Sequence, residues 1–254
     1  MNPVIKWIYQ LGTPHFLYPR IEAWLPWLGW ISLMGLVVGL VWGLVLAPTD
    51  YQQGEAFRII YVHVPAAWLS MMVYVAMAVM AVMVLVWRIA VAELALAASA
   101  MIGAGFTLIA LLTGAIWGKP MWGAWWVWDA RLTSELILLF IYLGIFVLYQ
   151  SIEDKRHAGK AASLMTLVGL INIPIIHYSV IWWNTLHQPP SLSKFEAPSI
   201  HWDMLWPLLV MLLAFKLLYV FLLLLRMRWM LLERHANSAW VQKLVEQWGG
   251  KDRE

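Results

Sequence analysis

Residues 59–87 read IIYVHVPAAWLSMMVYVAMAVMAVMVLVW, a stretch without Asp, Glu, Lys or Arg. A helix needs about 20 apolar residues to cross the hydrocarbon core of a membrane, so this run is long enough to span it. Five other runs are similarly apolar: Ala23–Thr49, Leu94–Gly118, Leu136–Ile152, Ala161–Ser193 and Met204–Leu225, the last interrupted only by Lys216. The run at Leu136 extends back to Leu132 if Glu135 lies in the first helical turn. Membrane strands instead alternate apolar and polar residues in segments of about ten, which these continuous runs do not do.

The expected fold is therefore an all-α integral membrane protein, made of one six-span domain over residues 1–254. Its transmembrane helices are predicted at about residues 27–47, 64–87, 95–117, 132–150, 161–183 and 204–225. A short Trp-rich segment, residues 117–131, is expected at the membrane interface on the outer face.

The composition excludes two broad classes of protein. Hydrophobic residues make up 63% of the chain and charged residues 12%, whereas a soluble domain has roughly 45–50% apolar and about 25% charged residues. The low charge excludes an ordinary soluble enzyme, and the high apolar content excludes a disordered chain. The absence of cysteine excludes disulfide and thiolate chemistry. The net charge of +3 does not suggest a nucleic-acid partner.

The charges in the loops predict the orientation of the chain. Six spans place both termini on one side of the membrane, together with the second and fourth loops. That side carries 12 of the 17 Lys and Arg residues and the opposite side four, while Lys216 lies within the sixth run. Because cytoplasmic loops are enriched in basic residues, both termini are expected in the cytoplasm. The outward loops are then Pro48–His63, Trp117–Arg131 and Asn184–Asp203.

The middle outward loop is unusually aromatic. It reads WGKPMWGAWWVWDAR and holds five of the 19 tryptophans: Trp117, Trp122, Trp125, Trp126 and Trp128. If the stretch is helical, Trp122, Trp125, Trp126 and Asp129 share one face of a helix that lies along the membrane surface. One interpretation is an aromatic belt that anchors helix ends at the membrane interface. The other is a platform for a large planar ligand, because stacked aromatic rings bury flat apolar area.

Two histidines flank this loop on the same side of the membrane. His63 precedes Val64 and Pro65, and proline disfavours helical geometry in the residue before it, so His63 is expected just outside the second span. His187 follows the fifth span and precedes prolines that would stop a helix. Each histidine alone could be an ordinary interfacial residue. The pair beside a Trp platform fits axial ligation of haem iron by neutral imidazoles.

Three further residues carry weaker signals. His177 is expected to be a packed polar residue of the bundle, next to a kink at Pro174, and His201 is an alternative ligand. Lys216 lies near the middle of the sixth span, where a lysine is costly and is usually paired or extended toward the interface. Contact with another subunit is the functional interpretation of Lys216.

The charged residues near the Trp-rich loop have candidate roles at the same site. Arg58, Lys119 and Arg131 are three of the four outward basic residues, and they suit the anionic propionates of a haem. Asp129 has two open interpretations, because it can cap the helix that begins near Leu132 or belong to the site. Glu135 is expected to pair with Arg131 across one helical turn.

Together these residues resemble the Trp-rich (WWD) signature of the haem-handling proteins of cytochrome c maturation. The matching segments are Trp117–Glu135, Tyr51–Gly54, Arg58–Ala67, Pro174–Val180 and Trp182–Gln188. They cover most of the chain between about Pro48 and His187. Within that superfamily, the small size and the single pair of flanking histidines resemble the cytochrome c maturation protein C family. The larger members, which ligate haem to apocytochrome, have more spans and extra histidines.

The resemblance implies a haem-binding and haem-delivery protein rather than an enzyme. It implies that His63 and His187 are the axial ligands of haem b at the periplasmic face. It also implies that Trp117–Asp129 holds the macrocycle and presents its edge to a periplasmic haem chaperone (CcmE-like). The implied location is the bacterial inner membrane.

The same resemblance implies a complex with three kinds of membrane-associated partner. These are an ATP-binding subunit, a second multi-span subunit and a small single-span subunit (CcmA-, CcmB- and CcmD-like). This sequence contains no P-loop, so any use of ATP would belong to a partner.

Two other classes of protein stay open. A haem-containing membrane oxidoreductase subunit that passes electrons to quinone would place its haem ligands inside the spanning helices, whereas here they are expected at helix mouths. A transporter or channel would need polar groups along a path through the membrane. Only Asn172, His177 and Lys216 qualify, and the sequence does not connect them.

Overall fold

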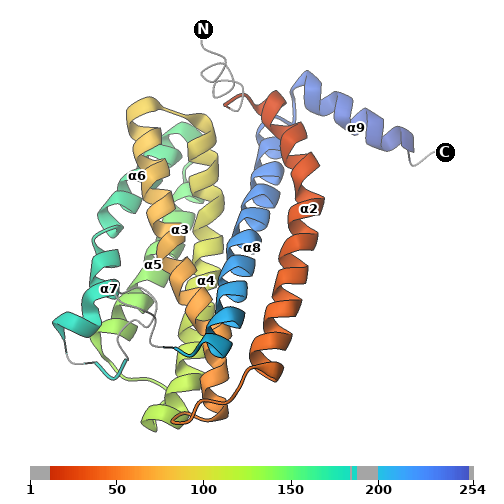
Figure 1. Ribbon diagram of the computed structural model, residues 1–254. Helices are drawn as coiled ribbons and strands as arrows, with labels where there is room; N and C mark the ends of the chain where they lie inside the picture. Colours follow the sequence, from red (N-terminus) through yellow and green to blue (C-terminus); the bar gives the residue numbers. More distant parts are fainter. Residues whose placement is uncertain (1–11, 184, 188–199, 252–254) are drawn as a thin grey trace, which may run out of the picture.

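The computed structural model describes residues 12–183, 185–187 and 200–251, and these residues are largely helical (Figure 1). In chain order the helices are α2 (Pro14–Val41), α3 (Ile60–Trp87), α4 (Ala90–Trp122), α5 (Ala130–Ser151), α6 (Lys155–Gly169), α7 (Asn172–Trp182), α8 (Trp202–Arg234) and α9 (Ala239–Lys251). A π-helical turn, η1 (Trp42–Leu46), follows α2, and a 3₁₀ turn, η2 (Glu55–Ile59), leads into α3. Within these ranges the only β-type pairing is an isolated bridge between Asp50 and Gly54.

Six helical stretches are long and apolar enough to cross a membrane. They cover residues 14–46, 55–87, 90–122, 130–151, 155–182 and 202–234. The fifth stretch combines α6 and α7, and α9 lies outside all six. The expected all-α fold with six transmembrane helices is therefore confirmed.

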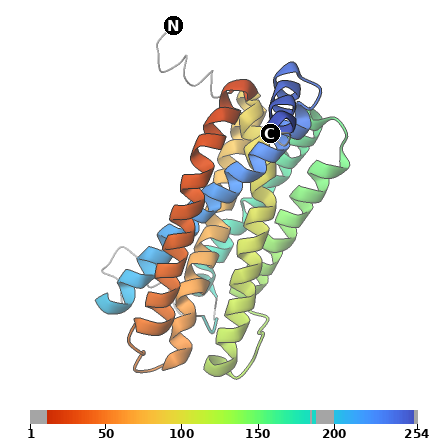
Figure 2. The ribbon, with the colours of Figure 1, turned by 90° about the vertical axis from the view of Figure 1, so that its right-hand side faces the viewer.

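The bundle is built around the α3–α4 pair. α5, α6 and α8 pack around these two helices, and α2 lies at the edge, where its main neighbour is α8 (Figures 1 and 2). The largest side chains that are fully buried include Tyr61, Leu69, Tyr74, Leu138 and Tyr142. Two of these tyrosines link neighbouring helices, because Tyr142 donates to the carbonyl of Ser70 at 2.7 Å and Tyr74 to that of Thr166 at 3.0 Å. The phenol groups of Tyr74 and Tyr142 thus find backbone acceptors, whereas the buried hydroxyl of Tyr61 has no partner.

Small residues allow α4 and α5 to approach each other closely. The buried face of α4 is rich in alanine, and Gly103 lies directly against Tyr142. A Cβ atom on Gly103 would lie 2.2 Å from the ring of Tyr142. Small side chains at the interfaces of membrane helices have this general role, since helix packing in lipid depends on close van der Waals contact.

The Trp-rich segment does not form a single surface helix. α4 continues to Trp122, and only residues 123–129 are non-helical. Gly123 ends α4 in the left-handed conformation (φ 76°), which glycine adopts without strain. The expected helical face shared by Trp122, Trp125, Trp126 and Asp129 is therefore wrong, because the helix stops between its first two members.

His63 lies inside a helix and not outside its mouth. η2 runs directly into α3 at Ile60, so His63 is in the first turn of α3 although Pro65 follows. The restriction that proline places on the preceding residue is a preference. Here the continuous helical stretch that begins at Glu55 overrides it.

The fifth span is irregular near its middle. α6 ends at Gly169 and α7 begins at Asn172, but Leu170 and Ile171 between them keep right-handed helical dihedral angles, so the irregularity is local and lies where the kink near Pro174 was expected. Pro174 has no N–H to donate to the carbonyl of Leu170, which accepts instead from Ile173 at 3.1 Å. The side chain of Asn172 donates to the carbonyl of Ser134 at 2.9 Å, which ties the start of α7 to α5.

The two ends of the bundle carry different features. α2 begins and α8 ends at the same end, where α9 also lies (Figure 1). The segments that precede α3 and α5 lie at the opposite end (Figure 1). Most of the third expected outward loop, Asn184–Asp203, lies outside the described residues.

Candidate functional site

His63 and His187 come together at the end of the bundle that is opposite to α9. Their ring centroids are 6.3 Å apart, and the ring planes are inclined by 42°. His63 is held by α3, whereas His187 follows the end of α7, so two distant parts of the sequence meet here. The structure thus brings together the two histidines that the sequence places on either side of the Trp-rich loop.

The ring of His63 is fixed by α4. Its Nδ1 lies 3.1 Å from the carbonyl of Ala110 and 3.0 Å from the hydroxyl of Thr113. The Thr113 hydroxyl donates to the carbonyl of Ile109 at 2.6 Å, so both neighbours of Nδ1 act as acceptors. Nδ1 therefore carries the proton, and the Nε2 lone pair of His63 is available to a ligand.

The imidazole of His187 lies in an environment that keeps it neutral. Burial first, and then the positive charge of Arg131, lower the pKa of His187 to about 4. Its Nδ1 is buried and has no hydrogen-bond partner. A neutral ring with an unpartnered nitrogen is suited to binding a metal.

Two tryptophans of the Trp-rich segment frame the histidine pair. Trp117 lies edge-on to His63, with centroids 5.6 Å apart, and Trp122 packs against His187 at 5.1 Å. The indole N–H of Trp117 donates to Oε1 of Gln53 at 3.0 Å. Because both tryptophans belong to the last turns of α4, the helix extension that ends at Gly123 is what places them beside the histidines.

The other three tryptophans follow Gly123. Trp125 and Trp128 are 58% and 75% exposed, so both present large apolar surfaces outward. Trp126 packs against Trp128 at 5.3 Å, and its indole N–H is buried without an acceptor. Exposed aromatic rings next to a buried unpartnered donor are unusual for a purely structural loop, since buried polar groups are normally paired.

Asp129 caps α5, which is one of its two predicted roles. Its Oδ1 accepts from the backbone N–H of Leu132 at 2.8 Å, which caps the start of α5. Its Oδ2 is buried and has no partner. The cap uses one carboxylate oxygen and leaves the second free, so the site interpretation remains compatible with the capping role.

The three basic residues proposed for anionic groups make different contacts. Arg131 is half-buried, acts electrostatically on His187, and donates to the carbonyl of Ile176 at 2.9 Å. Lys119 is exposed, and its ammonium group contacts the carbonyl of Gly123 at 3.0 Å. Arg58 donates to the carbonyls of Gly43 and Ala47, at 3.2 and 2.6 Å, and pairs with Glu55. Its contacts therefore stabilise the segment between α2 and α3.

Glu135 has a different partner from the one expected. Its carboxylate accepts from the hydroxyl of Ser70 at 2.7 Å and lies buried between α3 and α5. Arg131 points instead to α7, and no ion pair within 4 Å joins it to Glu135. The two charged groups interact electrostatically, but the direct contact predicted across one turn is not made, because each side chain hydrogen-bonds to a neighbouring helix.

Sequence reasoning assigned no role to three polar residues at this site. Gln53 and Thr113 hold Trp117 and His63, and the buried hydroxyl of Thr185 has no partner. Gln53 and Thr185 belong to the segments Tyr51–Gly54 and Trp182–Gln188, which carry part of the resemblance, and this was the available signal for them. Thr113 lies in an apolar run, where a hydroxyl bonded back to its own helix is common.

The remaining candidate residues are engaged elsewhere. His177 packs edge-on against Tyr178, with centroids 4.8 Å apart. His201 accepts from the N–H of Asp203 at 3.4 Å and caps α8. The ammonium group of Lys216 lies 4.6 Å from the ring centre of Trp68, so a cation–π contact partners this lysine within the bundle.

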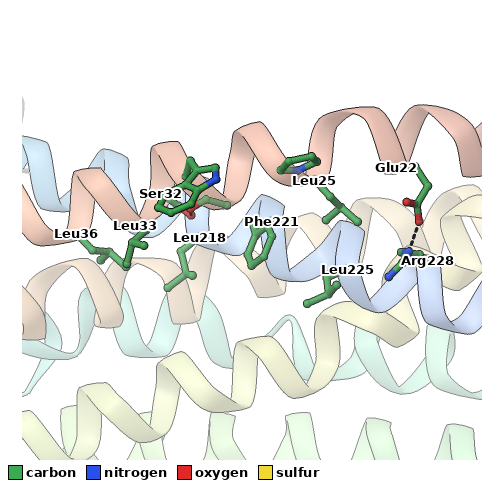
Figure 3. Close-up of a pocket in the computed structure, with 12 residues that line it drawn as sticks. Glu22, Leu25, Ser32, Leu33, Leu36, Leu218, Phe221, Leu225 and Arg228 are labelled. Carbon is green, nitrogen blue, oxygen red and sulfur yellow. Dashed lines mark hydrogen bonds and ion pairs between the residues drawn. The ribbon is translucent and has the colours of Figure 1, made fainter. Parts of the chain in front are cut away.

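A groove of about 630 Å³ lies between α2 and α8, away from the histidine pair (Figure 3). Its walls are mostly apolar, including Leu25, Leu33, Leu36, Leu218, Phe221 and Leu225. Glu22 and Arg228 form an ion pair at one end (Figure 3). The groove shares no residue with the site around His63 and His187.

Comparison with known proteins gives a consistent result. The family described as heme exporter protein C matches residues 7–242. The chain is 51% identical over 241 residues to heme exporter protein C of Haemophilus influenzae, with 95% of this chain and 98% of the relative covered. It is 50% identical over 247 residues to that of Escherichia coli, covering 97% and 99%. It is 50% identical over 231 residues to that of Bradyrhizobium diazoefficiens, covering 91% and 88%.

The fold defines a multi-pass membrane protein whose paired histidines lie at one end of the helical bundle. The chain belongs to the heme exporter protein C family. The family resemblance expected from the Trp-rich signature is thereby confirmed.

Proposed function

We propose that this protein holds haem between His63 and His187 and hands it to a periplasmic haem chaperone during the biogenesis of c-type cytochromes. The printed names of its relatives, heme exporter protein C, support haem as the cargo. The observation that carries the proposal is the pair of imidazoles whose ring centroids are 6.3 Å apart. The protein acts in this scheme as a binding and delivery protein.

The spacing of the two rings suits one iron ion. Haem iron accepts two axial imidazoles. Two metal–nitrogen bonds of about 2 Å, with about 1 Å more from each nitrogen to its ring centre, would place the centroids roughly 6 Å apart. The hydrogen bonds from Nδ1 of His63 to α4 support this role, because they leave Nε2 as the free ligand atom.

The side chains around the histidines suit the rest of a haem. Trp117 and Trp122 pack against the two histidines and would provide apolar walls for a flat macrocycle. Arg131 is the basic residue best placed for a propionate, and Lys119 offers a second cation at the end of α4. Arg58 would act mainly by holding the segment before α3 in place.

The exposed tryptophans support a docking role for the same end of the bundle. Trp125 and Trp128 present apolar rings in the segment that directly follows α4, and exposed aromatic residues are typical of protein-binding sites. We assign this surface to the periplasmic chaperone (CcmE-like). In this scheme the membrane is the bacterial inner membrane and both termini are cytoplasmic. The ATP-binding, multi-span and single-span subunits (CcmA-, CcmB- and CcmD-like) would form the rest of the complex.

An absorption spectrum of the purified chain loaded with haem b tests the ligand assignment. The natural chain should show the spectrum of iron with two imidazole ligands. His63→Ala or His187→Ala should convert it to a spectrum with one strong axial ligand, and the double variant should lose tight binding. His177→Ala is the matched control, because among the described residues the ring contact of His177 is with Tyr178 and not with the histidine pair. A two-imidazole spectrum that survives in the double variant would overturn the assignment.

Transfer to the chaperone needs a separate measurement. Trp125→Ala and Trp128→Ala should slow the transfer of haem from the loaded protein while leaving its haem spectrum intact. Trp229→Ala is the control, because Trp229 is similarly exposed but lies near the C-terminal end of α8, at the end of the bundle away from the histidine pair. Equal transfer rates in all three variants would show that Trp125 and Trp128 take no part in the transfer of haem to the chaperone.

A further inference from the structure

We propose that α9 is an interfacial helix that rests on the lipid headgroups at the membrane face where α8 ends. Its apolar side carries Trp240, Val241, Leu244 and Val245, and its polar side carries Gln242, Lys243, Glu246 and Gln247. At about 100° per residue, the four apolar residues fall within an arc of roughly 140°, and the polar residues occupy the opposite arc. This pattern is amphipathic along the part of α9 whose side chains are described.

A hydrogen-bonded turn sets the direction of α9. The carbonyl of Ser238 accepts from the N–H groups of Val241 and Gln242, both at 3.1 Å, and the N–H of Ser238 donates to His235 at 2.8 Å. This turn directs α9 away from the axis of α8, so that it extends sideways from the bundle (Figure 1). A helix in this position crosses the direction of the spans and does not continue α8 into solvent.

The apolar side of α9 is covered at its start and uncovered further on. Trp240 packs against Tyr18 and His15, with ring centroids 5.6 and 6.3 Å apart, and Val241 is 5% exposed. One turn later on the same side, Val245 is 55% exposed. The covered part anchors α9 to the beginning of α2, and the uncovered part needs an apolar environment outside the bundle.

The position of α9 along the bundle identifies that environment as lipid. Arg226, Arg228 and Arg234 occur in the last turns of α8, after its apolar run, and mark where the sixth span reaches the headgroup region. α9 begins immediately beyond this level. Arg228 and Arg234 pair with Glu22 and Glu93 inside the bundle, whereas Lys243 on the polar side of α9 is exposed and complements anionic headgroups. Amphipathic helices in such positions bury their apolar side about 5–10 Å into the interface.

The absence of cysteine from the natural chain makes a site-specific test possible. Spin labels on Val245→Cys and Glu246→Cys, each in the full-length protein in nanodiscs of phosphatidylethanolamine and phosphatidylglycerol, report one position on the apolar side and one on the polar side of α9. Collision with oxygen indicates lipid, and collision with a water-soluble nickel chelate indicates solvent. Leu213→Cys, on an exposed position of α8, gives the value for a span surrounded by lipid.

The ratio of oxygen to nickel collisions should be severalfold higher at position 245 than at position 246, and closer to the value at position 213. Gln242→Cys should behave like Glu246→Cys. If position 245 meets the nickel chelate as readily as position 246, α9 stands in water and the proposal is wrong. If position 245 is shielded from both reagents, protein covers this side of α9, which also overturns it.

Discussion

The hydroxyl oxygen of Thr113 lies 3.0 Å from Nδ1 of His63. Because this hydroxyl already donates to the carbonyl of Ile109, it can only accept from the ring, as does the carbonyl of Ala110. α4 therefore sets both the orientation and the tautomer of a side chain that belongs to α3. The candidate ligand depends on a helix that contributes no ligand itself.

Thr113→Val should weaken haem binding without removing it. Loss of a hydrogen bond to a ligating histidine typically costs about 10–100-fold in metal affinity, and we expect about tenfold because Ala110 still accepts from Nδ1. Haem titration followed by absorption measures the change. Thr107→Val is the control, because Thr107 donates to the carbonyl of Gly103 in the same helix. Similar affinities for both variants would contradict the role of Thr113.

Substitutions at Asp129 should separate capping from site function. Asp129→Ala removes the acceptor for the N–H of Leu132 and should cost about 0.5–2 kcal/mol of stability, measured as a lower unfolding temperature. Asp129→Asn retains a capping oxygen and should preserve most of that stability. If Asp129→Asn still impairs haem transfer, the unpartnered Oδ2 has a function at the site. If Asp129→Asn transfers haem normally, the role of Asp129 is limited to capping α5.

Two glycines of α4 provide a test of its packing. Gly103→Ala would place a Cβ 2.2 Å from the ring of Tyr142, and overpacking of this kind typically costs about 1–3 kcal/mol. Gly105→Ala meets nothing within 4 Å and should be neutral or slightly stabilising. Thermal unfolding in detergent measures both. A Gly103→Ala protein as stable as Gly105→Ala would show that α4 and α5 are not closely packed at this point.

Acid should destabilise the haem-free protein partly through His187. Its pKa falls from 6.5 to about 4 on folding, because burial and then Arg131 disfavour the charged ring. Between these values the unfolded chain binds the proton and the folded chain does not, so stability falls as the pH falls through this window. His187→Gln cannot titrate and should lose less stability between pH 7 and about pH 4.5. Equal losses in both proteins would contradict a buried neutral His187.

The six spans could be predicted because crossing hydrocarbon requires a long apolar run, and residues 59–87 show this without any tertiary information. The meeting of His63 and His187 followed from topology, since both flank loops on one side of the membrane. The exact ends of the helices were less predictable than the spans themselves. The end of α4 depends on the conformation of Gly123, and the start of α3 includes His63 although Pro65 follows.

The supporting contacts of the site were beyond sequence reasoning for a different reason. Gln53 with Trp117, Ser70 with Glu135 and Arg131 with Ile176 each join residues that are distant in sequence. Such pairs are set by the way the helices pack, which apolar periodicity does not specify. The predicted pairing of Arg131 with Glu135 failed on this point, because local spacing was used where packing decides.

The histidine pair also orders events during synthesis of the chain. His63 and its acceptors on α4 are complete once the third span has been made, whereas His187 follows only after α7. Chains grow from the N-terminus, so the first half of the site must wait while two more spans enter the membrane. A chain that stops before α7 contains a fixed imidazole and no partner for it. The site therefore exists only in molecules whose fifth span has been inserted, and its presence reports that assembly has reached that stage.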